Sequence, residues 1–209
     1  MELPASVVAV LAGYERDAAS LLVDYEAVPP ADKLRWVADL IPTSPRSIAD
    51  VGAGSGADAA WLAVRGHSVL AIEPVEALRL AGAILHPCER IEWLDDALPS
   101  LAKARTRAGH FDLVLVSAVW HHLHADLWEE ALVSIGRMTR PGGTVLMSLR
   151  NGPGAARRPT FPVSPERILD LAARHGLRTI RRVRAESMQQ RNRDAGVTWD
   201  WLAFESPAE

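Results

Sequence analysis

The sequence has little cysteine, little lysine and no long apolar run, and each shortage excludes something. Cys88 is the only cysteine among 209 residues, so no disulfide can form within the chain and a reducing compartment is expected. No stretch approaches the roughly 20 apolar residues that span a bilayer, and Glu2 stands where a secretory leader would carry basic residues. We therefore expect a cytoplasmic protein without a membrane partner.

Strong charge of one sign is also missing, since the formal net charge is -3. Such a chain lacks the positive field that draws proteins onto nucleic acid, and no nucleic-acid partner is expected. The charges are unevenly placed: residues 1–45 carry seven acids and three bases, whereas residues 150–193 carry eleven arginines and three acids. The basic part is either an ordinary solvated surface, which we favour, or a surface that binds anions.

Length and hydrophobic content bound the architecture. At 209 residues, of which 48% are hydrophobic, one sizeable core can form and one domain is expected. Runs such as V-L-A-I and L-V-L-V are short and almost continuously apolar, which is typical of strands in a parallel sheet covered on both faces. Two helices, at about 11–25 and 32–41, come before the sheet. The strands are then expected at 47–51, 68–73, 90–94, 111–116 and 143–149, and the helices at 57–65, 75–85, 99–107 and 125–138.

After the fifth strand, strands no longer alternate with helices. Ser164 and Pro165 start a further helix. Two strand-like segments, 177–183 and 197–204, follow with no helical pattern between them, so the sheet should finish as an antiparallel pair joined by residues 186–196. The prediction is an α/β fold with a doubly wound, mostly parallel seven-stranded sheet and helices on both faces.

The strongest chemical signal is a glycine turn after the first strand. Residues 48–56 read I-A-D-V-G-A-G-S-G, and Glu73 closes the next apolar run. Such a turn, followed by a carboxylate at the tip of the neighbouring strand, holds the ribose of an adenosine-bearing ligand. Taken alone, the pattern also fits a nicotinamide dinucleotide. Asp50 argues against that ligand, because it would bring negative charge near a pyrophosphate and suits an ammonium and a sulfonium better.

Five segments together resemble class I, seven-strand S-adenosylmethionine-dependent methyltransferases, particularly small-molecule enzymes with the ubiquinone-biosynthesis type of domain. They read D-V-G-A-G-S-G, I-E-P, L-D-D-A-L-P, S-A-V-W-H-H-L and R-P-G-G-T-V-L-M. One such motif is weak evidence, whereas five in order are specific. The resemblance implies a Rossmann-like methyltransferase core at 46–209, with 1–45 as a helical lid in the same domain. It also implies methyl transfer from S-adenosyl-L-methionine to oxygen or nitrogen of a small metabolite, with S-adenosyl-L-homocysteine as product.

The resemblance assigns the ribose and methionine portions of the cofactor to the first two strands. Glu73 would accept hydrogen bonds from both ribose hydroxyls. Backbone amides of the turn would face the ligand, because a side chain there would block contact; these residues are Gly52, Ala53 and Gly54. Ser117 and Ala118, at the end of the fourth strand, would line the methionine side, and further cofactor contacts are expected from Asp50, Pro74 and His122.

The adenine edge is assigned to the segment after the third strand. Asp96, or alternatively Asp95, would accept a hydrogen bond from the adenine amino group, and Ala97 would offer its backbone N–H to a ring nitrogen. The competing interpretation is that the two acids only initiate the following helix.

A histidine cluster follows the fourth strand, where the family places residues near the transferred methyl group. Imidazole titrates near working pH, so His122, or His121, could take the proton from an attacking hydroxyl. The alternative is that one histidine packs under the cofactor while the others are solvated, and His124 is disfavoured as the base. A metal site formed with Asp126 is the least favoured interpretation and no metal is expected, because no second cluster of ligands stands out.

The acceptor is narrowed by missing motifs. The fourth strand is not followed by [DNS]-P-P-[YFW], with which amino-methylating enzymes of nucleic acids grip a flipped base. A small-molecule acceptor therefore remains, in a pocket that could be walled by Tyr14, Tyr25, Trp36 and Trp120. An anionic group on it could be bound by Arg150, Arg157, Arg158, Arg191 and Arg193. A cofactor-binding module without catalysis and a nicotinamide-dependent oxidoreductase are the alternatives; the chain is expected to be a monomer or a homodimer.

Overall fold

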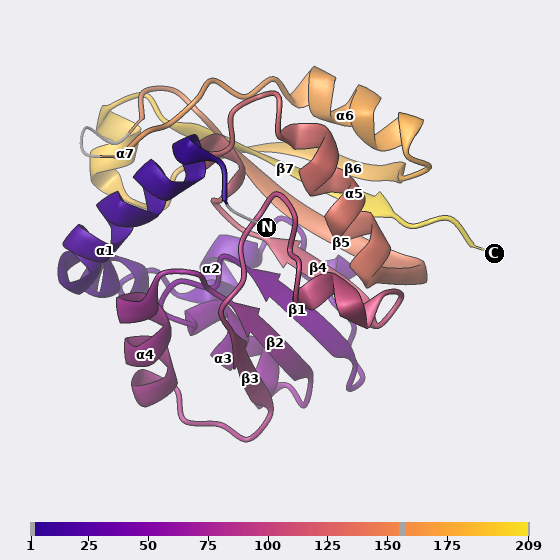
Figure 1. The fold of residues 1–209 in the computed structure, drawn as a ribbon, viewed down its shortest axis with the longest axis horizontal. Helices are drawn as coiled ribbons and strands as arrows, with labels where there is room; N and C mark the ends of the chain where they lie inside the picture. The colour runs from indigo at the N-terminus through magenta and orange to yellow at the C-terminus, as the bar shows by residue number, and fades with distance from the viewer. Residues whose placement is uncertain (1–2, 155–157, 209) are drawn as a thin grey trace.

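The computed structural model describes residues 3–154 and 158–208, which form a seven-stranded sheet flanked by helices (Figure 1). The strand order is β3-β2-β1-β4-β5-β7-β6. β7 runs antiparallel to both of its neighbours, while the pairs from β3 to β5 are parallel, which confirms the predicted fold. The strands are β1 (Ser47–Val51), β2 (Ser68–Ile72), β3 (Ile91–Leu94), β4 (Phe111–Val116), β5 (Thr139–Asn151), β6 (Arg178–Glu186) and β7 (Thr198–Glu205).

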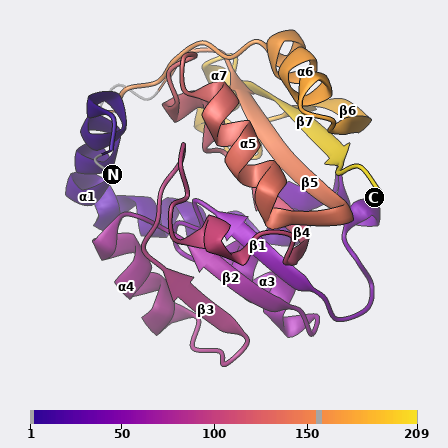
Figure 2. The same ribbon diagram turned by 45° about the vertical axis from the view of Figure 1, so that its right-hand side comes forward.

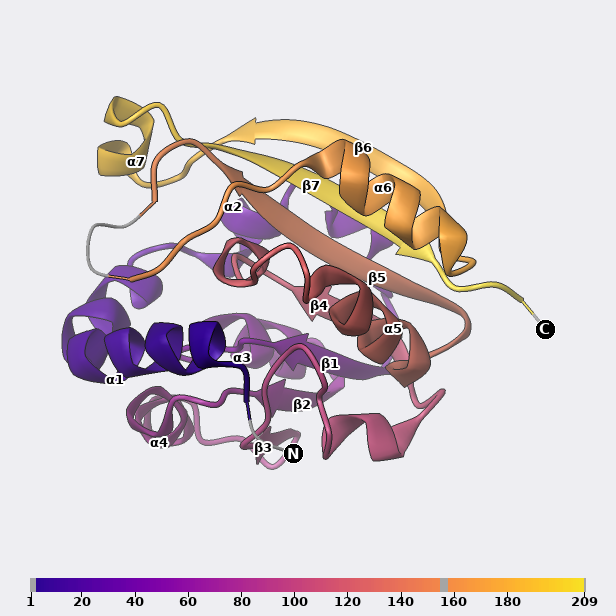
Figure 3. The ribbon, with the colours of Figure 1, turned by 45° about the horizontal axis from the view of Figure 1, so that its top comes forward.

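Two cores lie on opposite faces of the sheet, because successive side chains of a strand point to opposite sides. In β1, Ala49 and Val51 belong to one core and Ile48 to the other. The first face is covered mainly by α5 (Trp128–Met138) and α6 (Pro165–Arg174), which lie together in Figure 3. The second is covered by α2 (Pro30–Leu34) and α3 (Ala57–Val64). Continuously apolar strands are therefore needed, because both faces are buried.

Helix α1 (Ala5–Glu26) lies where the parallel strands end, beside α4 (Glu76–Leu85) (Figures 1 and 2). The Glu15 carboxylate on α1 accepts hydrogen bonds from the Ala77 amide in the first turn of α4, at 3.3 and 3.4 Å. Near the C-terminal end of α1, Asp24 pairs with Arg191 at 2.7 Å. Polar ties from the middle and from the C-terminal end of α1 therefore fix the helix across this edge of the sheet.

The helical region before the sheet differs from the prediction. The expected helix at 32–41 is split into α2 and the short 3₁₀ helix η1 (Ala38–Leu40). Val37 interrupts it with φ of -133°, outside the helical region. Pro30 occupies the first turn of α2, where the missing N–H costs nothing.

Two later elements were also predicted wrongly. Instead of a helix at 99–107, the structure has the 3₁₀ helix η2 (Ala104–Arg107) after an irregular loop. The Asp96 carboxylate accepts hydrogen bonds from the Lys103 and Ala104 amides, both at 2.8 Å, and so competes with helical bonding. The connection at 186–196 contains α7 (Gln190–Asp194), a five-residue helix too short to show a hydrophobic period.

Other local predictions hold. The Ser164 hydroxyl accepts a hydrogen bond from the Arg167 amide at 3.2 Å, and Pro165 follows it at the first position of α6.

A further 3₁₀ helix, η3 (Trp120–His122), carries the first two histidines of the cluster. None of the described helices combines the length and the apolar character needed to cross a bilayer.

Candidate functional site

A cavity of about 730 Å³ opens where β1, β2 and β4 end. The strand order reverses between β1 and β4, and ligands of open α/β sheets bind outside the strand ends at such a reversal. The opposite wall is formed by α1 and by residues 186–199. The predicted site residues that line it are Gly52, Ala53, Gly54, Glu73, Pro74, Asp96, Ala97, Ser117, Ala118, His121 and His122.

Some predicted residues are not brought to this cavity. Asp50 is buried under the glycine turn and does not line it. Asp95 points away, with a side chain 57% exposed that contacts Lys103 at 3.3 Å. Trp120 is buried in the core, although the other three predicted aromatic residues do line the cavity. Arg157 lies outside the described residues.

The turn after β1 has room only for glycine at its tightest points. Gly52 has φ of +74°, and a Cβ there would lie 2.4 Å from the Val119 Cγ2 atom. Gly54 has φ of +59°, and a Cβ there would lie 3.2 Å from the ring of Tyr25. Side chains would thus be strained and would fill space at the cavity edge.

The amides of this turn already have partners inside the protein, which differs from the expectation that they face the ligand. Gly52 and Ala53 both donate to the Ile72 carbonyl, at 2.8 and 3.0 Å, because they continue the bonding between β1 and β2. Gly54 donates to Glu73. The turn therefore gives a ligand room to approach the backbone closely, but these three amides are not free to donate hydrogen bonds to it.

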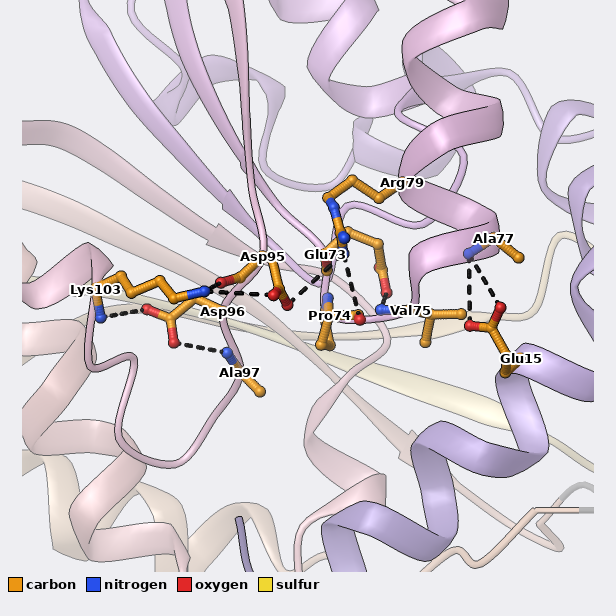
Figure 4. Close-up of polar contacts among 10 residues, drawn as sticks. All are labelled: Glu15, Glu73, Pro74, Val75, Ala77, Arg79, Asp95, Asp96, Ala97 and Lys103. Carbon is orange, nitrogen blue, oxygen red and sulfur yellow. Dashed lines mark hydrogen bonds and ion pairs between the residues drawn. The ribbon is translucent and has the colours of Figure 1, made fainter. Parts of the chain in front are cut away.

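Glu73 is held in place by backbone donors on both oxygens, and Figure 4 shows the one from Val75. Its Oε2 accepts from the Gly54 amide at 2.7 Å, and its Oε1 accepts from the Val75 amide at 2.9 Å. Burial raises the pKa of Glu73 to about 7, although these two hydrogen bonds oppose the shift. Each oxygen keeps a lone pair, so the oriented carboxylate can still accept from two hydroxyl groups.

Asp96 and Ala97 lie side by side at the cavity edge and bond to each other (Figure 4). The Ala97 amide donates to Asp96 Oδ1 at 2.9 Å, while Oδ2 accepts from the amides at 103 and 104. One carboxylate therefore closes the loop that follows β3. The second acid, Asp95, forms exposed contacts with Lys103 and Arg79 instead.

Three ionisable groups gather below the glycine turn. Lys33 of α2 pairs with Asp58 in the first turn of α3, with 2.6 Å between Nζ and Oδ2, and both residues line the cavity. Asp50 lies beside them, and burial, together with the nearby Asp58, raises its pKa. Sequence reasoning missed Lys33 and Asp58. The available sequence signal for Asp58 was its position in the first helical turn after the glycines.

The histidines have three different environments. His122 is buried and bonded through both ring nitrogens, to Tyr14 and to the Pro159 carbonyl. His121 is buried against it with ring centroids 4.2 Å apart, and its Nδ1 has no hydrogen-bond partner among the described residues. His124 is exposed and pairs with Asp126 at 2.6 Å. In the described part of the chain, no three His, Cys, Asp or Glu side chains are grouped to hold a metal ion.

The candidate arginines differ in whether a carboxylate already neutralises them. Arg158 pairs with Asp17 at 3.2 Å, and Arg191 pairs with Asp24. Arg150 donates to the Pro153 carbonyl at 2.8 Å, and no carboxylate of the described residues lies within ion-pair distance of it. The arginines of β6 all pair with acids, which supports an ordinary solvated surface there; they are Arg178, Arg181, Arg182 and Arg184.

Known proteins share this fold and parts of this sequence. A protein family described as methyltransferase domain matches residues 25–200. An uncharacterized methyltransferase of Mycobacterium tuberculosis is 30% identical over an alignment of 122 residues, which covers 54% of this chain. The match covers only 42% of that relative, so this chain spans less than half of the length of the curated protein it matches.

Solved structures match over nearly the whole chain. The Burkholderia thailandensis 1,6-didemethyltoxoflavin-N1-methyltransferase aligns with a TM-score of 0.74 and 22% identity, over 99% of this chain and 92% of that one. A TehB-like methyltransferase of Corynebacterium glutamicum aligns with a TM-score of 0.67 and 20% identity, over 92% and 98%. The N-methyltransferase NodS of Bradyrhizobium japonicum aligns with a TM-score of 0.65 and 17% identity, over 88% and 97%.

At these identities the structures establish the fold, while the family match extends over most of the sequence. The chain therefore belongs to the methyltransferase domain family and has the class I fold of S-adenosylmethionine-dependent methyltransferases.

Proposed function

We propose that this chain transfers a methyl group from S-adenosyl-L-methionine to oxygen or nitrogen of a small molecule. The observation that carries the proposal is the continuity of the cavity, which joins Glu73 and the glycine turn to the buried histidines and to the inner side of α1. Methyl transfer needs donor and acceptor in one enclosed space, in line and about 3–3.5 Å apart. A cavity of about 730 Å³ is in the range that small ligands occupy.

The residues at the strand ends fit the cofactor. Glu73 would accept from the ribose hydroxyls, and the glycine turn would let the ligand approach the backbone closely. Asp96 Oδ1 accepts one hydrogen bond and keeps a lone pair for the adenine amino group, whereas Oδ2 already accepts two. Ser117, Ala118 and Pro74 would line the methionine side, below which Asp50, Asp58 and Lys33 lie. When bound, the cofactor supplies an electrophilic methyl group on a sulfonium.

The acceptor enters, in this proposal, from the side of α1 and residues 186–199. Of the arginines that line the cavity, Arg158 and Arg191 are neutralised by acids, and Arg150 is best suited to an anionic substituent because its guanidinium has only neutral acceptors among the described residues. Trp199, within 5.8 Å of the guanidinium, adds an aromatic surface beside it. We propose an acceptor with a carboxylate or phosphate near the reacting atom. The structural relatives named above include two N-methyltransferases, which favours nitrogen as one target.

The same geometry supports a lid role for residues 1–45. Tyr14, Tyr25 and Trp36 from this segment line the cavity, so it would cover bound ligands. Its polar ties to α4 and α7 would hold it in place.

Two measurements test the activity. Calorimetric titration with S-adenosylmethionine, S-adenosylhomocysteine and NADH should show binding of the first two alone; binding of NADH alone would instead support an oxidoreductase. Incubation with methyl-labelled donor and a metabolite extract should then give a labelled small molecule. Donor binding with no labelled product from any extract would support a cofactor-binding module without catalysis.

A further inference from the structure

Tyr14 and His122 form a buried pair whose hydrogen-bond direction is fixed by a third group. The His122 Nδ1 atom lies 2.9 Å from the Pro159 carbonyl oxygen, and its Nε2 atom lies 2.6 Å from the Tyr14 hydroxyl. A carbonyl oxygen can only accept, so Nδ1 carries the hydrogen. The neutral ring then has its lone pair on Nε2, and Tyr14 must donate to it.

The surroundings keep both members neutral. Burial lowers the pKa of His122 to about 4, and the nearby Arg158 and Arg150 guanidinium groups act in the same direction. Burial also raises the pKa of Tyr14, although Arg158 over its ring and a hydrogen bond from Tyr25 oppose the shift. Glu73 and His121 are the other titratable groups near the pair. A neutral pair does not repel a cationic donor brought into the same cavity.

We propose that Tyr14 is the catalytic residue that takes the proton from the methyl acceptor, with His122 behind it as the group that receives Tyr14's own proton. The inference rests on the proposed methyltransferase activity. Both residues line the cavity. Because the Tyr14 hydrogen is committed to His122 and one lone pair accepts from Tyr25, the Tyr14 oxygen has its second lone pair for an incoming O–H or N–H. His122 is then not in direct contact with the acceptor, which refines the sequence-based assignment of the base.

The proton and electron balance is complete without another reactant. The acceptor atom bonds to the methyl carbon while the carbon–sulfur bond breaks. The electron pair of the broken bond stays on sulfur, so the sulfonium becomes a neutral thioether. The acceptor proton passes to the Tyr14 oxygen as the Tyr14 proton passes to Nε2 of His122. The resulting imidazolium keeps its Nδ1–H bond to Pro159 and loses its extra proton to water after the product leaves.

The chemistry of the pair selects a class of acceptor. An alkylammonium holds its proton with a pKa of about 10.4, as lysine does, and would not release it to this pair. A hydroxyl oxygen that has just bonded to the methyl carbon is a strongly acidic oxonium, and it releases its proton far more readily. A weakly basic ring nitrogen does the same. The pair therefore suits hydroxyl groups and weakly basic nitrogen rather than alkyl amines.

The pair can be tested without any acceptor. Nitrogen-15 NMR of labelled histidine rings should show His122 as the Nδ1–H tautomer with a hydrogen-bonded Nε2 at pH 7.5. Tyr14→Phe should shift the Nε2 resonance of His122, whereas His124→Gln should remove only the exposed histidine's signals. An Nε2–H tautomer, or an Nε2 resonance unchanged in Tyr14→Phe, would overturn the proposal.

Catalysis provides the second test, with the acceptor found by labelling. Tyr14→Phe and His122→Gln should each lower kcat by about 10²-fold or more and abolish its pH dependence on the acidic side, while His124→Gln keeps the original profile. Binding of S-adenosylhomocysteine by Tyr14→Phe should match the original protein. An unchanged kcat and pH profile in Tyr14→Phe refutes the relay, whereas failure of the original chain to bind S-adenosylhomocysteine refutes the proposed function instead.

Discussion

Glu73 at the end of β2 accepts a hydrogen bond from the amide of Gly54 in the turn after β1, at 2.7 Å. This bond connects the two elements that the sequence assigns to one ligand. It also explains why the carboxylate keeps a single orientation in a buried position, where an acid without partners would be costly. Ligand affinity and protonation should therefore both depend on this one side chain.

Replacing Glu73 should weaken cofactor binding. Glu73→Gln keeps the shape but removes the charge that strengthens hydrogen bonds from ribose hydroxyls, so the Kd for S-adenosylhomocysteine should rise about tenfold or more. Calorimetry measures this directly. Glu76→Gln, three residues further on and exposed, should bind as the original chain does. Equal affinities of the two variants for S-adenosylhomocysteine would show that Glu73 does not bind the cofactor.

Cofactor affinity should also depend on pH. The pKa of Glu73 is raised to about 7 by burial, so the carboxyl is mostly protonated below that pH and ionised above it. Only the ionised form offers charge-assisted acceptance on both oxygens. Affinity for S-adenosylhomocysteine should therefore increase as pH rises from 6 to 8, and Glu73→Gln should lose most of that increase. If Glu73→Gln kept the same pH dependence, the effect would come from the titration of another group.

The space at Gly52 should tolerate no side chain. Gly52→Ala would place a Cβ 2.4 Å from Val119 and force alanine to a φ of +74°, costing about 1–3 kcal/mol of unfolding free energy and most of the cofactor affinity. Gly136→Ala is the control, because that glycine is inside α5 with no atom within 4 Å of a built Cβ. The control should be neutral or slightly stabilised in urea unfolding. A Gly52→Ala protein as stable as Gly136→Ala would contradict the geometry.

Arg150 should matter for an anionic acceptor and not for the donor. Arg150→Gln should raise the KM of such an acceptor about tenfold or more, with little change in kcat, because it removes binding shared by ground state and transition state. Arg178→Gln, on the exposed side of β6 and paired with Glu205, serves as the control. An unchanged KM in steady-state kinetics would show that the acceptor's anionic group, if present, is bound elsewhere.

Local signals predicted most of the fold and the cofactor end of the site. The expected strand at 111–116 coincides with β4, because continuous apolar character decides a strand buried on both faces. The glycine turn and Glu73 were recognisable because each belongs to a short segment with its own pattern. The helix expected at 99–107 failed because the side chain of Asp96 binds amides seven and eight residues away, which no periodicity reports.

The acceptor end could not be predicted in the same way. Tyr14 and His122 are 108 positions apart, and only the docking of α1 across the strand ends brings them together. The role of His122 depends on the Pro159 carbonyl, a backbone group that carries no sequence signal. Lys33 and Asp58 likewise meet only because α2 packs against α3.

The pair of Lys33 and Asp58 should contribute to stability in a pH-dependent way. Lys33→Met removes the cation that pairs with buried Asp58 and that lies near buried Asp50. Removing one partner of a fully buried pair costs about 3–5 kcal/mol. Because the Lys33 side chain is 32% exposed, we expect a smaller loss of about 1–3 kcal/mol at pH 8.

The direction of the pH effect follows from Asp50. Its pKa is raised in the folded chain, so the folded state holds a proton that the unfolded state has lost, and stability falls as pH rises through the folded pKa. Lys33 lowers that pKa, and its removal deepens the loss at high pH. Urea unfolding should therefore show a larger penalty for Lys33→Met at pH 8 than at pH 5. Lys103→Met, at the exposed second lysine, should show little penalty at either pH, and a pH-independent penalty for Lys33→Met would mean that lost packing rather than charge is responsible.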